Sequence, residues 1–309
     1  MRRALPYLLL AGAALFWAGN ITTGRALRDA WPPLPLNLAR WLVALAVLLP
    51  FTWPSLRVHA ATLRRHVAWL AALALTGVVL YQTFLYQALA STTVVTASLI
   101  AANTPVAIAL GAWLVFGDRP TRRQALGIVV SLAGALVVVA RGDLHVLLGL
   151  RLTPGDLWML AAVPCWAAYS LLLKRSPPGL PQVTLVVATS AIGALMLVPL
   201  AAWRLWAGDV VVLTPGSLAG ALYIGVFAGA LAFVFWNRGV AAVGATRAGV
   251  FLHLMPLFAA LLGVTFLGER LAAHHLVGGA LVMTGLVLAS TRARPRGETP
   301  AQAERPRPR

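Results

Sequence analysis

The chain has 309 residues, of which 60% are hydrophobic and 11% are charged, and its mean hydropathy is +0.83. Because soluble domains carry roughly 25% charged residues, this composition excludes an ordinary soluble protein and indicates a membrane protein. The net charge is +17, but the basic residues fall in short loops and in the tail, which is typical of membrane topology and not of nucleic-acid binding. The single cysteine, Cys165, excludes an internal disulfide, and no Cys and His spacing suggests a metal site, so we expect neither metal nor cofactor.

Ten apolar stretches are long enough to cross a bilayer as helices, which takes about 20 mostly apolar residues. The first could be read as a signal peptide, but Trp17 and its surroundings reappear at Trp166, so we expect a retained helix. The linkers are short, and residues 292–309 form a basic, Pro-rich tail that we expect to be disordered. In chain order the predicted helices are residues 5–24, 34–53, 67–87, 93–116, 123–140, 155–173, 182–203, 217–237, 247–267 and 273–291.

One segment of the chain occurs twice. Residues Ala97–Gly134 align without a gap on Ala248–Gly285, at an offset of 151 residues. Ala and Leu matches are common in so apolar a chain, so the coincidences of Pro, Gly and Arg are the informative ones. They are Pro105 with Pro256, Gly117 with Gly268, Arg119 with Arg270, Gly127 with Gly278 and Gly134 with Gly285. The chain is therefore predicted to contain two five-helix repeats, residues 5–140 and 154–291.

The distribution of basic residues predicts the orientation of the repeats. With the N-terminus inside, the inner side carries 15 Lys and Arg residues before the last three tail arginines, and the outer side carries six. This bias places both termini in the cytoplasm. Because each half has an odd number of helices, the second half enters the membrane upside down, and its copy of the loop replaces Arg122 with Ala273 and Arg123 with His274. Two inverted five-helix repeats are typical of secondary transporters, whose site lies near the midplane between the halves.

Several motifs resemble one protein family. The first helix contains FWAGNITTGRAL, and the second half contains CWAAYSLLLKR at the matching place. An aromatic-rich third helix leads into a Pro-containing fourth helix in FLYQALASTTVVTASLIAANTP, and a G-[DE]-R turn closes both copies. Together these motifs resemble the drug/metabolite transporter superfamily, specifically its ten-helix proteins with two EamA domains. The resemblance implies a permease of a bacterial-type inner membrane, commonly an exporter of amino acids, other metabolites or drugs, without naming the cargo.

Pro105 and Pro256 are expected in the middle of their helices. A proline there removes a backbone hydrogen bond, and the freed carbonyl is tolerated in lipid only if it faces protein or a wet cavity. Paired proline-interrupted helices therefore indicate a transport site, and the alternative is a static kink that shapes packing.

Polar residues inside the predicted helices are expected to face a central cavity, because buried polar groups in lipid need partners. The alternative is simple hydrogen bonding between helices. The polar candidates are Asn20, Gln82, Tyr86, Asn103, Tyr169, Asn237 and His253. Aromatic residues expected to form apolar walls are Trp17, Tyr81, Phe84, Trp166, Phe235 and Trp236.

Arg40 is the one cation well inside a predicted helix. It is a candidate partner for an anionic group on the cargo, although we favour a structural interpretation in which it snorkels to the outer edge of the membrane. All eight acidic residues fall in loops, at helix ends or in the tail, so proton coupling through a mid-membrane carboxylate has no obvious carrier. His253 is the one deep group that titrates near neutral pH, although a packed hydrogen-bonding role is the commoner one.

Helices 123–140 and 273–291 carry matching small residues, Gly127, Ser131 and Gly134 in one and Gly278, Gly279 and Gly285 in the other. These seams predict close packing between the halves.

The function expected is transport of a small-molecule substrate across the bilayer by alternating access, with a monomer favoured over a dimer. Direction and energy coupling are left open. Two alternatives are a membrane enzyme acting on a lipid or phosphate substrate, for which the Asp118 to Arg123 cluster is the nearest feature, and a non-transporting scaffold.

Overall fold

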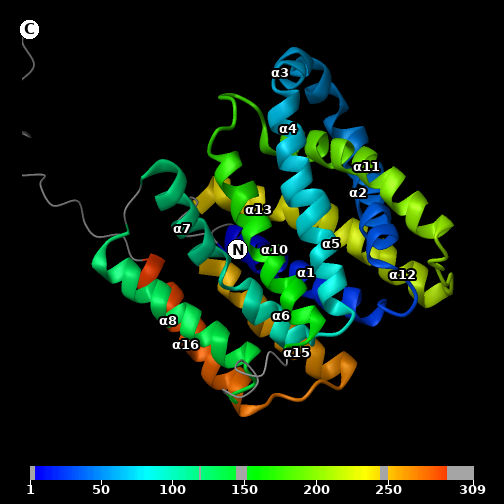
Figure 1. The fold of residues 1–309 in the computed structure, drawn as a ribbon. Helices are drawn as coiled ribbons and strands as arrows, with labels where there is room; N and C mark the ends of the chain where they lie inside the picture. Colours follow the sequence, from blue (N-terminus) through cyan, green and yellow to red (C-terminus); the bar gives the residue numbers. More distant parts are fainter. Residues whose placement is uncertain (1–3, 118–119, 144–151, 244–249, 291–309) are drawn as a thin grey trace, which may run out of the picture.

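The computed structural model describes residues 4–117, 120–143, 152–243 and 250–290, and every regular element within these ranges is helical (Figure 1). The helices follow the predicted order, and eight of the spans are long and apolar enough to cross a membrane. These are Leu5–Ala26 (α1), Pro33–Val58 (α2), Val67–Leu89, Val94–Phe116, Arg122–Val139 (α8), Pro154–Leu173 (α10), Gln182–Trp206 (α11) and Pro215–Val243. The other two expected helices are apolar but shorter, Leu254–Leu267 (α15) and Ala273–Ser290 (α16), and the short α3 (Ala60–Arg65) follows α2.

Two spans contain a π-helical segment that the sequence did not predict. Val67–Leu89 is built from α4 (Val67–Leu73), η1 (Ala74–Leu80) and α5 (Tyr81–Leu89). Pro215–Val243 is built from α12 (Pro215–Tyr223), η2 (Ile224–Leu231) and α13 (Ala232–Val243). The two π segments end at Leu80 and Leu231, which are 231 − 80 = 151 residues apart, the same offset as the sequence repeat. Such segments are rare and often mark functional sites.

The expectation that both prolines lie in the middle of a helix is wrong. The span Val94–Phe116 breaks into α6 (Val94–Ala101) and α7 (Thr104–Phe116), so Pro105 lies in the first turn of α7, where its missing N–H removes no helical bond. The carbonyl oxygen of Ala101 accepts a 2.6 Å hydrogen bond from the Thr104 hydroxyl. Pro256 likewise lies in the first turn of α15, just after the 3₁₀ turn η3 (Val250–His253). Each proline therefore lies at the start of a helix.

The packing between the two halves is reciprocal. Helix α1 of the first half packs against α13 and α15 of the second, and its counterpart α10 packs against α5, α6 and α7 of the first. In the same way α2 contacts η2, while its counterpart α11 contacts η1. The halves therefore interlock through equivalent elements, and the opposite orientation of the second copy stays a prediction.

The two predicted small-residue seams meet. Helices α8 and α16 lie side by side along one edge of the bundle (Figure 1) and form its most extensive helix pair among the described residues. Their backbones approach so closely that a methyl group at Gly134 would lie 2.6 Å from the carbonyl oxygen of Gly278. Glycine is needed there because any side chain would push the helices apart.

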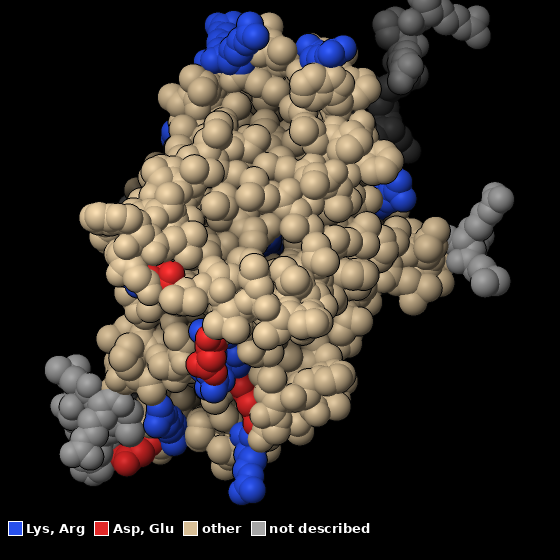
Figure 2. Space-filling view, turned by 90° about the vertical axis from the view of Figure 1, so that its right-hand side faces the viewer, with Lys and Arg blue, Asp and Glu red and all other residues tan. Residues whose placement is uncertain are grey.

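The outer surface matches a lipid environment. In Figure 2 most of the charged side chains on the visible face lie near its two ends, and uncharged residues cover most of the surface between them. Large apolar side chains point outward along the helices, among them Leu114 at 79% and Leu195 at 73% exposure. Such a band is expected where helices face acyl chains, and the chain is a polytopic membrane protein.

Candidate functional site

A cavity of about 340 Å³ lies where the two halves meet. This volume falls in the range of roughly 300–1,000 Å³ that is typical of small-molecule sites. Fourteen of its lining residues form pairs at corresponding positions of the two halves, at an offset of 149 residues for α1 with α10 and of 151 for the later helices. The pairs are Trp17 with Trp166, Ile21 with Ser170, Gln82 with Phe233, Leu85 with Trp236, Ala101 with Leu252, Thr104 with Met255 and Pro105 with Pro256.

The structure brings seven of the sequence-predicted residues to this cavity. Both prolines line it, which places the two helix breaks at one site although they are 151 residues apart in the chain. Of the aromatic residues expected as walls, Tyr81 and Trp236 line it as well. The seven predicted site residues are Trp17, Asn20, Arg40, Gln82, Pro105, Trp166 and Pro256.

Five predicted residues whose side chains the structure describes are not among the residues that line this cavity. Tyr86 is buried one turn beyond Gln82. The Asn103 side chain donates to the carbonyl of Leu99 and accepts from the hydroxyl of Ser131, which is the alternative role of hydrogen bonding between helices. Tyr169 packs on Trp166 with ring centroids 5.0 Å apart, whereas Phe235 packs away from the cavity on Phe16. Asn237 is half-buried, and its Nδ2 has no partner within the described part of the chain. The side chain of His253 lies outside the described residues.

Phe233 is a lining residue that sequence reasoning missed. It lies two positions before Phe235, which was expected at the site, and helical geometry turns the two side chains to different faces. The repeat offset contained the needed signal, because Gln82 + 151 is Phe233. Phe84 was also expected as a wall, but it packs on Trp158 with centroids 5.1 Å apart.

Arg40 does not snorkel to the membrane edge, which corrects the favoured interpretation. Its side chain is 1% exposed, and its Nη1 donates to Asn20 Oδ1 at 3.1 Å and to the Tyr86 hydroxyl at 3.3 Å. The Tyr86 hydroxyl in turn donates to Asn20 Oδ1 at 2.8 Å, which closes a buried triangle between α1, α2 and α5. The guanidinium also lies 4.9 Å from the Trp41 ring centroid. We call Asn20, Arg40 and Tyr86 the arginine niche.

The side chains of α2 also reach both π segments. Arg40 Nη2 donates to the carbonyl of Ala228 in η2 at 3.4 Å, and Asn37, one turn earlier, donates to the carbonyl of Val78 in η1 at 2.9 Å. Helix α2 therefore carries one donor toward each irregular segment. The arginine niche lies beside η2, between the first half and the second.

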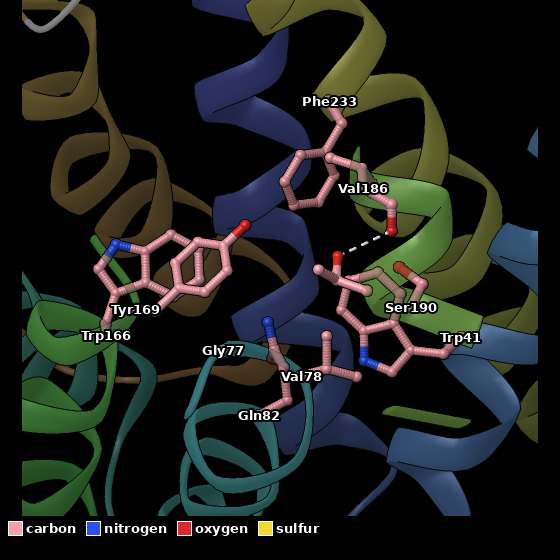
Figure 3. A pocket seen from close by; sticks show the side chains of 10 residues that line it. Trp41, Gly77, Val78, Gln82, Trp166, Tyr169, Val186, Ser190 and Phe233 are labelled. Atoms are coloured by element: carbon pink, nitrogen blue, oxygen red, sulfur yellow. Dashed lines mark hydrogen bonds between the residues drawn. The ribbon is translucent and has the colours of Figure 1, made fainter. Parts of the chain in front are cut away.

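A second, much smaller cavity of about 10 Å³ lies next to the first and shares Gln82, Trp166 and Phe233 with it (Figure 3). The amide of Gln82 points into the space between Tyr169 and Trp41, below the ring of Phe233. This volume is about that needed for one water molecule. The Gln82 Oε1 atom is buried and has no partner among the described residues, so it is free to accept a hydrogen bond.

The cavity is closed at one end and open at the other. Ile21 and Leu85 form part of its floor, are each 2% exposed, and belong to the largest apolar cluster. Beyond this floor, Glu269 accepts hydrogen bonds from the backbone N–H groups of Val94 at 2.7 Å and Val95 at 3.2 Å, and so joins the second half to the start of α6.

The open end lies near the helix breaks. Pro105 and Leu252 line the cavity and are nevertheless exposed, Leu252 at 38%, so the lining of the site extends to the molecular surface at these residues. Figure 2 shows a small hollow in the uncharged surface with a basic side chain visible at its bottom. Arg40 is the one basic residue among those that line the cavity.

Comparison with known proteins identifies one family over nearly the whole chain. The EamA-like transporter family matches residues 4–140 and, separately, residues 153–291. Uncharacterized transporter YwfM of Bacillus subtilis is 30% identical over 307 residues, which cover 98% of this chain and 99% of that protein. A probable terminal-alkyne amino-acid exporter of Streptantibioticus cattleyicolor is 31% identical, covering 89% of this chain and 90% of that protein. A solved crystal structure with 21% identity matches with a TM-score of 0.57 and covers 92% of this chain and 96% of the other, which supports the fold.

Proposed function

Because the chain belongs to the EamA-like transporter family and is a membrane transporter of small molecules, we propose that it exports amino acids or related metabolites by alternating access through the central cavity. The observation that carries the proposal is the paired lining, with seven positions from each half facing one space. A site built equally from two related halves becomes accessible from either side when the halves rock about it.

The two ends of the cavity define the state of the transporter. The end closed by Ile21, Leu85 and the Glu269 contacts is the predicted outer end, and the open end near Pro105 and Leu252 is the predicted inner one. With both termini in the cytoplasm of a bacterial-type cell, as we propose, this arrangement is that of an inward-open state in the inner membrane. Cargo enters this state from the cytoplasm, which suits export.

Several finer features belong to the same proposal. The two repeats, residues 5–140 and 154–291, act as the rocking units, the second inverted relative to the first, and residues 292–309 are a disordered tail. The protein works as a monomer because its site is complete within one chain. We propose that it is not an enzyme, since the polar groups of the described lining residues are amides, hydroxyls, indole N–H groups and one guanidinium, which suit binding of a solute.

Flux measurements test the proposal. Purified protein is reconstituted into proteoliposomes loaded with a panel of labelled amino acids, organic acids, nucleosides and amines, and efflux is compared with that from protein-free vesicles. The variant Gln82→Leu, which removes the free acceptor in the cavity, should slow efflux, whereas Phe84→Leu outside the cavity should not. Equal efflux with and without protein for the whole panel would overturn the proposal.

A further inference from the structure

We propose that the cargo carries a carboxylate or an equivalent single anionic group, and that Arg40 binds it at the first-half side of the cavity. This inference rests on the proposed function, since it names the chemistry of the solute that enters the same site. Four observations support it. The buried charge of Arg40 has no acidic partner in the described part of the chain, and its guanidinium has unused N–H donors. The two halves differ in charge at this position, and the cavity walls suit the apolar part of a solute.

The charge of Arg40 has no acidic partner in the described part of the chain. The ion pairs there are Arg28 with Asp29 and Arg204 with Asp209, both away from the cavity. The partners of Arg40 are an amide oxygen, a hydroxyl and a carbonyl, all neutral. A buried, unpaired guanidinium in a low-dielectric setting is costly, and an anion that reaches it gains correspondingly. The site is thus suited to bind a negative group.

The guanidinium also has hydrogen-bond donors to spare. It carries five N–H groups. Among the described residues there are two bonds from Nη1, one 3.4 Å bond from Nη2 and none from Nε, which is buried. The edge formed by Nε and Nη2 is the edge that a carboxylate engages with two parallel bonds. The niche therefore holds Arg40 by Nη1, and the Nε/Nη2 edge, whose one bond is the long contact from Nη2 to Ala228, can take a ligand.

The two halves match in shape but not in charge. At the offset of 149 that relates α1 to α10 and α2 to α11, Asn20 corresponds to Tyr169 and Arg40 to Thr189, and at the offset of 151 Tyr86 corresponds to Asn237. The small cavity beside Tyr169 and Thr189 is the second-half counterpart of the arginine niche, and none of the described residues that line it is basic. The second half packs in the equivalent way with the neutral Thr189 at this position. Holding the helices together therefore does not require a charge. The charge is present on one side only, where it can orient an asymmetric solute.

The rest of the site fits the remainder of such a solute. Trp17, Trp166, Phe233 and Trp236 form apolar aromatic walls around the space next to Arg40. Gln82 lines the same space, and its Oε1 has no partner among the described residues, so it can accept a hydrogen bond from an N–H group of the solute. The substrate class is therefore a small monocarboxylate with an apolar or aromatic body, with or without an amino group.

Two probes of nearly equal shape separate charge from packing. 3-Phenylpropanoate carries the anion, and 3-phenylpropanamide replaces it with a neutral amide. Binding of each is measured by the thermal stabilisation of the purified full chain in nanodiscs. In the wild type the carboxylate should bind at least about tenfold more tightly than the amide, since a charge-assisted bidentate contact contributes that much.

Arg40→Gln should bring the two affinities to within about twofold of each other, and Arg40→Lys should keep a reduced preference because the ammonium binds as a point charge. Arg25→Gln is the matched control: it removes an arginine whose Nη1 caps the carbonyls of Leu89 and Ala90 outside the cavity, and the preference should be unchanged. The ratio of the two affinities within one variant does not depend on general stability. If Arg40→Gln does not fold, the reduced ratio in Arg40→Lys decides.

An unchanged ratio in both Arg40 variants, equal binding of the two probes to the wild type, or no binding of the carboxylate would overturn the inference. Flux keeps it distinct from the proposed function. Carboxylate binding that depends on Arg40 without any efflux would leave the anion site standing and remove the transport proposal. Efflux of the carboxylate at the same rate in wild type and Arg40→Gln would leave the transport proposal standing and remove the anion site.

Discussion

Glu269 is the residue whose removal tests the closed end of the cavity most directly. Its two carboxylate oxygens accept from the N–H groups of Val94 and Val95, the first residues of α6, where the helix N-terminus favours negative charge. Glu269→Gln removes the charge and leaves one acceptor oxygen for two donors. A hydrogen bond to a charged group contributes about 1.5–3 kcal/mol, and partial exposure of Glu269 reduces the loss to about 1–2 kcal/mol.

This loss falls on the closed state alone if the Glu269 contacts break when that end opens. The ratio of closed to open molecules should then fall by a factor of about 5–30. The assay is the rate at which a membrane-impermeant maleimide, added on the Glu269 side, labels a cysteine placed at Ser170 in the cavity, with the native Cys165 replaced by alanine. The rate should rise in proportion to the open fraction.

Arg270→Gln is the control, because Arg270 is the exposed neighbour of Glu269 and its loss changes the charge of the same turn without touching α6. A labelling rate in Glu269→Gln equal to that of the parent would refute the reasoning, as would an equal rise in Arg270→Gln. The first result would mean that the contacts persist in both states, and the second that net charge matters more than the bond to α6.

Three further predictions concern packing, topology and the role of Asn103. Gly134→Val should lower the thermal unfolding temperature and the yield, because overpacking costs about 1–3 kcal/mol. Ala133→Val, on the exposed side of α8, should lower neither. Equal melting curves for the two variants would show that α8 and α16 are not tightly packed. Cysteines at Thr121 and Ala272 should be labelled from opposite faces of the membrane, and labelling from the same face would remove the inverted topology. Asn103→Leu should lower thermal stability and leave the affinity for cargo unchanged, since Asn103 bonds Leu99 and Ser131 and does not line the cavity; a change in affinity at unchanged stability would reverse that assignment.

Hydropathy and the repeat predicted most of the helices because both signals are distributed over many residues. The predicted span 67–87 and the observed Val67–Leu89 differ only at one end, since a change of a residue or two in length barely alters the transfer free energy. The α8 and α16 seam was predictable for a similar reason, because several small residues at helical spacing leave a groove that only a closely packed second helix fills. The π segments were not predictable, because they depend on which hydrogen bonds form within an apolar helix and not on its composition.

Residues of the candidate site could be predicted where their position in the repeat places them at the cavity. They could not be predicted where the direction of the side chain depends on its hydrogen-bond partners. Trp17, Gln82 and the two prolines were found because they are conspicuous residues inside apolar helices. The depth of Arg40 in α2 was known from the sequence, but its direction was not, because the same residue can snorkel outward or turn inward depending on its neighbours. Asn20 and Tyr86 are those neighbours, and they lie 20 and 46 residues away in the chain.

The bonds of Arg40 suggest how cargo binding couples to movement of the halves. Nη1 contacts only Asn20 and Tyr86 of the first half, whereas Nη2 reaches Ala228 of the second half over 3.4 Å, the longest of the three bonds. A carboxylate that engages Nε and Nη2 competes with Ala228 for the same donor, so it weakens a contact between the halves while keeping Arg40 fixed in its own half. A ligand shifts a conformational equilibrium only through a difference in affinity between the two states. In a state where the halves have moved and Ala228 has withdrawn, Nη2 no longer bonds the second half, so the anion binds that state more tightly. The arginine niche can therefore favour the transition that carries the cargo across the membrane.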